Sequence, residues 1–246
     1  ALDVKDGMCI PRVKKGAPIY QRKEKESKDE KDAYFVAGTK DKYIYAQNML
    51  FPRMHSSSHA DAYESWMGGV EGTETPYDRC GESVMVKMPT QLENLRFFIS
   101  YQCNFMYWRY FMWNFAGRQN DIQGNGELEH GNWITGFSWF DNWRLGDQSK
   151  LPDTLKENKG HNVFYCLPLL LGLIGLFWQA YKGKRGIRQF WVVFFLFFMT
   201  GLAIVIYLNQ TPMQPRERDY AYAGSFYAFA IWCGLGVIAL YDLLTR

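Results

Sequence analysis

The chain has 246 residues, a formal net charge of +3 and 22% charged residues, so its charge is small and of mixed sign. That balance offers no basic surface for nucleic acid, and no spacing typical of an RNA-recognition motif, a helix-turn-helix or a zinc finger is present. The mean hydropathy of −0.29 resembles that of a soluble protein, but it averages two different parts. Residues 1–160 are polar and charged, whereas residues 161–246 are strongly apolar. The composition therefore predicts a polar region followed by a membrane region.

The cysteines show no CxxC pair and no spacing typical of a disulfide framework or a zinc site. Cys166 and Cys233 lie inside apolar runs, where a thiol behaves as a small hydrophobic side chain. Only Cys9, Cys80 and Cys103 have surroundings that suit a disulfide. We assign no metal ligand.

Residues 1–48 contain a mixed-charge run, Gln21 to Asp32, between two stretches in which apolar and aromatic residues alternate. Alternation on both sides of such a run predicts a short β-hairpin with a solvated tip.

In residues 49–90, His55 and His59 lie four positions apart, a spacing that binds zinc when both imidazoles share one helix face. Serines separate the two histidines and favour loops and caps, so we expect a surface loop. Phe51-Pro52-Arg53 predicts a turn that aims an arginine.

Residues 92–116 are dense in aromatic side chains. On a helical projection their apolar side chains cover nearly the whole circumference, which is typical of a buried or lipid-contacting helix. Arg96 and Arg109 argue against a helix that crosses the bilayer, because an arginine at the midplane is costly. Tyr and Trp favour the headgroup level. We predict a helix lying in or just above the membrane interface; a helix buried in a protein core is the alternative.

Residues 117–160 form a loop rich in Gly, Asn and Trp, in which amides and carboxylates are interleaved with Trp133, Trp139 and Trp143. Trp faces beside amide and carboxylate groups suit sugar rings, whose C–H faces stack while their hydroxyls form hydrogen bonds. The alternative is an ordered loop packed against the aromatic helix.

Three apolar runs are candidates for crossing a hydrocarbon core of about 30 Å: residues 163–181, 190–208 and 220–241. The link between the first two carries basic residues and no acid: Lys182, Lys184, Arg185 and Arg188. Such a link is expected in the cytoplasm, which puts 182–188 inside and both 1–160 and 209–219 outside. The predicted fold is a mainly α membrane protein with three transmembrane helices and a mixed, loop-rich outer region.

No catalytic triad, P-loop, dinucleotide fingerprint or zinc signature occurs in the sequence. Two polar groups are expected on the outer side: Arg216, Glu217, Arg218 and Asp219 before the third span, and Arg118, Asn120, Asp121 and Glu129 in the loop. An arginine at headgroup height grips a phosphate bidentately, and a nearby carboxylate orients it or acts as a general base. The alternative is a charged interface loop that sets topology through internal salt bridges.

Several segments carry a resemblance to a known family: Tyr107 to Gly126, Gly131 to Gly136, Gln210 to Trp232, Phe51 to Met54 and Asn94 to Gln102. They resemble multi-spanning membrane proteins of Bacteroidota catalogued as domain of unknown function 2723. That family is related to the protein O-mannosyltransferase-like glycosyltransferases of the GT-C class. The resemblance covers most of residues 49–245 and is thin over residues 1–48. It implies a bacterial inner-membrane protein with periplasmic loops and a partial GT-C-like architecture.

The resemblance also implies transfer of a sugar from a polyprenyl-phosphate donor to a protein hydroxyl or another periplasmic acceptor. Arg216 and Arg218 would bind the donor phosphate, with Glu217 and Asp219 positioning them. The sugar or acceptor side would be lined by Arg118, Asn120, Asp121 and Trp133. The implied partners are the bilayer, the lipid-linked sugar and a protein acceptor; no cofactor and no divalent cation is assigned.

GT-C enzymes of this kind carry their catalytic acid in the first outer loop, after an N-terminal spanning helix, and a DCGEF-like motif is expected there. These 246 residues contain neither feature, so we expect an internal piece of a longer family member. Asp121 and Glu217 are the candidates left for a catalytic carboxylate. The alternative function is a non-catalytic membrane subunit that docks a periplasmic or secretion partner. A transporter is disfavoured, because the predicted spans contain no acidic or basic residue.

Overall fold

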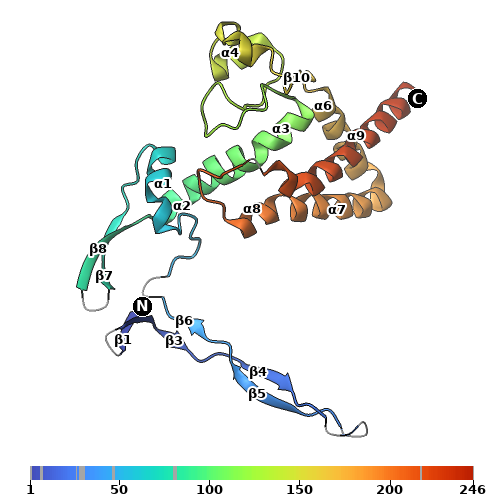
Figure 1. Cartoon of the computed structure of the whole chain (residues 1–246). Coiled ribbons are helices and arrows are strands. Elements are labelled where there is room, and N and C mark those ends of the chain that lie inside the picture. Colours follow the sequence, from blue (N-terminus) through green and yellow to red (C-terminus); the bar gives the residue numbers. More distant parts are fainter. Residues whose placement is uncertain are drawn as a thin grey trace. The chain divides into compact units, whose positions relative to one another are not determined.

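The computed structural model describes residues 2–5, 8–25, 27, 31–45, 48–79, 82–216 and 218–245. The chain divides into two compact units. The first comprises Ala1–Pro52 and Glu71–Gln91, and the second comprises Arg53–Val70 and Leu92–Arg246. Figure 1 shows β-hairpins in the first unit and mainly helices in the second.

The first unit consists of antiparallel strand pairs, β1 with β2, β3 with β6, β4 with β5 and β7 with β8. The strands are β1 (Leu2–Lys5), β2 (Met8–Pro11), β3 (Val13–Lys14), β4 (Pro18–Arg22), β5 (Tyr34–Thr39), β6 (Lys42–Tyr43), β7 (Thr73–Arg79) and β8 (Glu82–Met88). The hairpin predicted around the mixed-charge run is present, with Tyr20 opposite Val36 and Arg22 opposite Tyr34. Every residue of β4 and β5 is exposed.

The second unit is built around one continuous aromatic helix, residues 91–115. It comprises α2 (Gln91–Phe97), the π-helical η2 (Phe98–Trp108) and α3 (Arg109–Phe115). Its first half packs against α1 (Ala60–Met67), which follows the short turn η1 (Ser57–His59). Its second half packs against the apolar helices through Phe111, Met112 and Phe115. The aromatic helix therefore forms the core of this unit.

The π-helical segment of 11 residues changes which side chains face the core. An α-helical projection puts Leu95, Ile99 and Met106 on one face, but Leu95 and Ile99 are exposed whereas Met106 is buried. Hydrogen bonds in a π-helix run from residue i to i+5, so each turn holds more residues and the buried face rotates. The α-helical period therefore does not give the buried face of this segment.

The apolar part contains α6 (Leu167–Tyr181), α7 (Gly183–Thr200), α8 (Leu202–Leu208), the turn η4 (Asp219–Tyr222) and α9 (Ala223–Leu244). Among the described residues, two helical stretches are long and apolar enough to cross a membrane, Gly183–Leu208 and Asp219–Leu244. The third apolar helix, Leu167–Tyr181, is shorter.

The span predicted over 163–181 begins later than expected. Asn162–Val163 form the short strand β10, which pairs with β9 (Gly117–Arg118). Tyr165 and Cys166 then adopt positive φ angles of 52° and 56°, which stop a helix from extending through them. The 15 residues of α6 rise only about 22 Å, less than a hydrocarbon core of about 30 Å.

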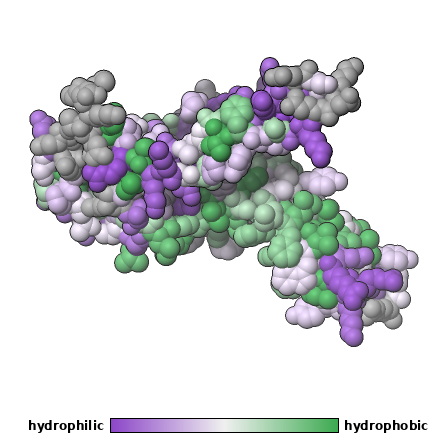
Figure 2. Space-filling model, turned by 90° about the horizontal axis from the view of Figure 1, so that it is seen from below, coloured by the Kyte–Doolittle hydropathy of each residue, from purple (hydrophilic) through white to green (hydrophobic). Residues whose placement is uncertain are grey.

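Helices α6 and α9 approach each other closely. A Cβ on Gly236 would meet the carbonyl of Leu171, and one on Gly175 would meet that of Trp232. The indole Nε1 of Trp232 donates to Gln179 Oε1 over 2.8 Å, which satisfies a buried amide. Helices α6, α7 and α9 bury the side chains that face one another. Apolar side chains on their other faces are exposed: Leu170, Phe177, Val192, Phe195, Met199, Tyr227 and Val237. Figure 2 shows hydrophobic side chains gathered in a contiguous green area of the surface.

Residues 117–163 form the tryptophan loop, which connects the aromatic helix to α6. It contains α4 (Ser138–Leu145), η3 (Gln148–Lys150) and α5 (Asp153–Lys156), and β9 and β10 close its two ends. Asp141 organises its centre: the buried carboxylate accepts hydrogen bonds from Thr135 N (2.9 Å), Thr135 Oγ1 (3.0 Å) and Gly136 N (2.8 Å). The loop is thus an ordered structure with its own polar core.

Candidate functional site

The junction segment, residues 209–222, links α8 to α9 and is held on the aromatic helix. Gln102 Nε2 donates to Asn209 Oδ1 (3.0 Å) and to the carbonyl of Gln210 (2.9 Å). The hydroxyl of Tyr101 donates to the carbonyl of Thr211 over 3.0 Å. Both Gln102 and Tyr101 belong to the π-helical segment. The π-helix therefore determines where the junction segment lies.

Arg53, the arginine of the predicted Phe51-Pro52-Arg53 turn, contacts the aromatic helix and the end of α8. Its guanidinium Nη1 donates to the carbonyl of Ile206 (2.9 Å) and to Gln102 Oε1 (3.4 Å). Burial lowers the pKa of Arg53, an effect that nearby Cys103 opposes. His55 Nδ1 lies 3.1 Å from Asn209 Nδ2. Of these contacts, only that of His55 reaches the junction segment, whereas those of Arg53 hold the end of α8 on the aromatic helix.

An aromatic cleft of about 360 Å³ opens where α1, the aromatic helix, the tryptophan loop and the junction segment meet. The lining residues are Ala62, Ser65, Trp66, Tyr101, Asn125, Gly126, Pro212 and Met213. Trp66 packs edge-on against Tyr101 at 4.8 Å between ring centroids, and its indole Nε1 donates to Ser100 Oγ over 3.3 Å. None of the lining residues is charged at neutral pH. The cleft therefore suits a neutral ligand with an apolar face, such as a sugar ring.

Arg216 and Arg218 lie on the junction segment just beyond the cleft. Arg216 is exposed, and its Nη2 donates to the hydroxyl of Tyr220 over 3.3 Å. Arg218 is half-buried; its backbone N–H donates to the hydroxyl of Tyr110 over 3.3 Å. Its side-chain Nε is buried and has no hydrogen-bond acceptor among the described residues. A buried guanidinium N–H without an acceptor is costly unless an anion supplies one.

Of the two carboxylates predicted to position these arginines, the structure describes only Asp219. Asp219 is exposed at the start of η4, and within the described part of the chain it forms no ion pair with Arg216 or Arg218. Glu217 lies outside the described residues. The phosphate-binding role assigned to the four residues stays a prediction.

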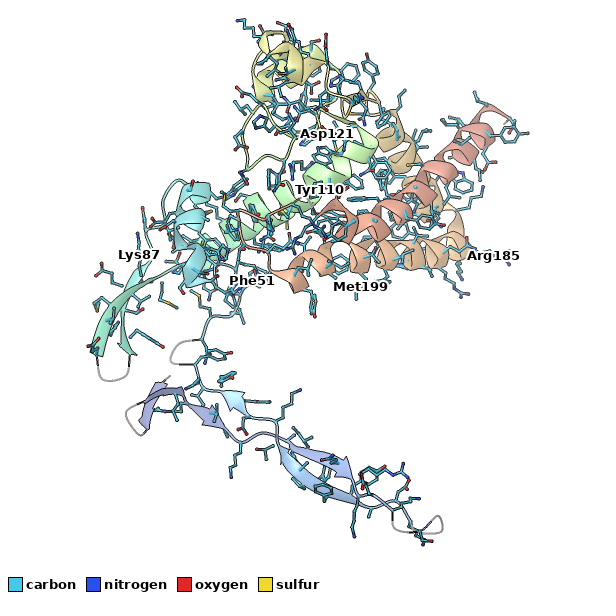
Figure 3. The ribbon with its side chains drawn as sticks, in the orientation of Figure 1. Phe51, Lys87, Tyr110, Asp121, Arg185 and Met199 are labelled. Atoms are coloured by element: carbon cyan, nitrogen blue, oxygen red, sulfur yellow. The ribbon has the colours of Figure 1, made fainter. Side chains whose placement is uncertain are left out.

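The residues predicted for the sugar or acceptor side lie together in the tryptophan loop. Arg118 Nε donates to the carbonyl of Gly160 over 2.9 Å. Asn120 is 0% exposed, with Nδ2 donating to the carbonyl of Glu129 (2.8 Å) and Oδ1 accepting from Gly131 N (2.8 Å). These two side chains are therefore committed to the loop backbone. Asp121, labelled in Figure 3 above the helix that carries Tyr110, is exposed.

Trp133 is half-buried and covered by Arg144. The guanidinium carbon of Arg144 lies 3.9 Å from the ring centroid, and Nη2 donates to the carbonyl of Trp133. Burial lowers the pKa of Arg144 to about 10, an effect partly offset by Asp141, so this side chain is still cationic at neutral pH. Because the guanidinium covers one face of the Trp133 ring, a sugar cannot stack on that face.

The cleft residues Trp66, Tyr101 and Met213 are the part of the site that sequence reasoning missed. They come from three distant segments, and each has the local pattern of an ordinary core or loop residue. The density of aromatic residues around Tyr101 was the available signal. Among the described residues, no group of three or more His, Cys, Asp or Glu is placed to hold a metal ion.

One family model matches part of the chain. The model of a family of unknown function (DUF8416) matches residues 3–99, which include most of the first unit, α1 and the start of the aromatic helix. No curated protein and no solved structure matches the chain. The matched region ends before the tryptophan loop and the junction segment, so it does not include Arg216 or Arg218.

Proposed function

We propose that this chain is the part of a GT-C-type membrane glycosyltransferase that binds a polyprenyl-phosphate sugar donor at the start of α9. One observation carries the proposal: Arg216 is exposed and Arg218 has a buried Nε without an acceptor among the described residues, directly before an apolar helix of spanning length. A lipid phosphate lies at this height when its polyprenyl chain is in the bilayer. Charge-assisted, bidentate contacts with guanidinium groups are the strong way to hold it.

The aromatic cleft next to these arginines supports the sugar part of the proposal. Pro212 and Met213 line the cleft, and Arg216 follows three residues after Met213. The rings of Trp66 and Tyr101 offer apolar faces, and the edge residues Ser65 and Asn125 offer hydrogen-bonding groups. A sugar ring presents the same combination of C–H faces and hydroxyls.

In the proposed transfer, the acceptor hydroxyl oxygen forms a bond to the anomeric carbon while the bond from that carbon to the donor phosphate oxygen breaks. The polyprenyl phosphate leaves with the electron pair, and the hydroxyl proton passes to a base. The arginines stabilise the charge that develops on the leaving phosphate. No carboxylate lines the described cleft. The chain is therefore assigned donor binding, with Asp121 and Glu217 as the candidate carboxylates in it.

The test measures binding of a short-chain polyprenyl-phosphate hexose to the protein reconstituted in lipid nanodiscs. Arg216→Ala and Arg218→Ala are each expected to raise Kd at least about tenfold, which is about 1.4 kcal/mol. Arg96→Ala is the matched control, because Arg96 is also exposed but lies on α2. Unchanged binding by a folded Arg216→Ala variant would overturn the proposal.

A second candidate is a non-catalytic membrane subunit that docks a periplasmic or secretion partner. One observation favours it: β4 and β5 form a two-stranded ribbon whose side chains are all exposed, including Tyr20 and Phe35. An isolated ribbon of this kind is marginal in water and gains stability when another element covers it. Co-purification of a stoichiometric partner that is lost on Tyr20→Ser and Phe35→Ser substitution would support this function.

A further inference from the structure

Helix α4 presents two large indoles to its surroundings. Trp139 and Trp143 lie one turn apart, on one face, and are 76% and 80% exposed. Their rings contact Phe140, at 5.7 Å and 5.8 Å between centroids. The opposite face of α4 is buried through Asp141 and Leu145. Neither tryptophan is thus needed for the core of the tryptophan loop.

Helix α4 is fixed to the start of α6. Phe137, which immediately precedes α4, packs edge-on against Tyr165 at 5.6 Å between centroids. Gly136 has φ +88°, and a Cβ there would lie 2.9 Å from Tyr165 Cε1, so the two segments are in close contact. Tyr165 comes two residues before α6 begins. The indoles are therefore held near the end of the apolar helices at which α6 starts.

Exposed apolar side chains also lie between α4 and α6 and on the first turns of α6. They are Phe137, Phe164, Tyr165, Leu167 and Leu170. The same helix, α6, exposes further apolar side chains that suit contact with lipid tails. Through the contact of Phe137 with Tyr165, the start of α4 adjoins the start of α6, whose exposed side chains face lipid if the helices are embedded.

We propose that α4 is a membrane-interface anchor whose Trp139 and Trp143 lie in the headgroup layer of the leaflet at the start of α6. An indole combines an apolar ring with one N–H donor, and this pairing favours the boundary between hydrocarbon and water. The proposal rests on membrane insertion of the apolar helices, and it does not depend on sugar transfer.

The structure disfavours a small-ligand role for these two rings. A cavity of about 280 Å³ lies beside α4, but its lining from that helix is Ser138, Asp141 and Asn142. Trp139 and Trp143 belong to the other face and line neither this cavity nor the aromatic cleft. Both rings are highly exposed outside these cavities, which suits a broad interface.

The test places a spin label at position 139 or 143 of the full chain in liposomes, with the native cysteines replaced by Ser. Labels at Lys150 and Phe195 are the matched references: Lys150 is 81% exposed in the same loop, and Phe195 is exposed on α7. Accessibility is measured to oxygen, which concentrates in lipid, and to a water-soluble nickel chelate. The labels at 139 and 143 are expected at a depth between those of the two references.

Nickel accessibility equal to that at Lys150 would overturn the anchor, and so would protection from both reagents, which would indicate a protein cover.

A second measurement keeps the native indoles. Lipids brominated near the headgroup should quench part of the wild-type fluorescence, and this part should disappear in Trp139→Phe/Trp143→Phe. An identical quenched fraction in that variant would also contradict the proposal. Retention of donor binding in the same variant separates this inference from the proposed function.

Discussion

Asn120 shows how a residue typical of binding sites can be committed to structure. Its side chain is fully buried and bonds to backbone groups of Ile122, Glu129 and Gly131 on both sides of a turn. All its hydrogen-bonding atoms point at the loop itself. A ligand would have to displace these bonds before it could use the amide.

Asn120→Ala should therefore destabilise the tryptophan loop. The substitution leaves Gly131 N–H without its acceptor in a buried place, at a cost of about 1–3 kcal/mol. The expected result is a lower thermal midpoint in detergent and faster tryptic cleavage within residues 117–163. Asp121→Ala is the control, because its exposed carboxylate should contribute less than about 0.5 kcal/mol. Equal midpoints for the two variants would show that the Asn120 contacts carry no stability.

At the level of elements, the backbones of α6 and α9 come close together at glycines. Gly236 leaves room for the backbone of Leu171, whereas nothing lies within 4 Å of a Cβ built on Gly234. Small residues let helix backbones approach in this way, and packing between them is a main source of association in lipid. The two glycines lie on one helix and provide a matched pair.

Gly236→Ala is expected to push α6 and α9 apart and to destabilise the protein by about 1–3 kcal/mol, as overpacking typically does. Gly234→Ala should be neutral or stabilising by up to about 1 kcal/mol, because alanine is the better helix former. Thermal unfolding in detergent, followed by size-exclusion chromatography, measures both. A Gly236→Ala protein as stable as Gly234→Ala would argue against the close α6–α9 packing.

The long apolar helices were predictable because hydropathy over a long run is a strong, local signal. It located α7 with α8, and α9, to within several residues. It failed at the start of α6, where pairing of Asn162 with Arg118 extends β10 and Cys166 takes a left-handed conformation. Such pairing depends on a segment 44 residues away along the chain, which no local pattern reports.

The candidate site was less predictable for the same physical reason. Arg216 and Arg218 stood out because charge directly before an apolar run is unusual. Trp66 and Met213 reach the cleft only through tertiary packing on the π-helical segment. That segment breaks the 3.6-residue period on which predictions of helix faces depend.

In the second unit as a whole, charged side chains lie at the two ends of the apolar helices. At one end Lys182 Nζ forms an ion pair with Asp242 Oδ2 over 2.7 Å, close to the basic link. Figure 3 shows Arg185 at this end. At the other end, where α8 ends and α9 begins, lies the junction segment with Arg216. A bilayer across the helices would keep the two ends in different compartments.

The central claim is that the basic link and the arginine-bearing junction segment lie on opposite sides of a membrane. The direct measurement is labelling of Arg185→Cys and Pro215→Cys in intact bacterial cells with a membrane-impermeant maleimide, in a background with the native cysteines replaced by Ser. Both positions are exposed. Position 215 is expected to be labelled in intact cells, and position 185 only after permeabilisation. Equal labelling of both positions in intact cells would contradict it.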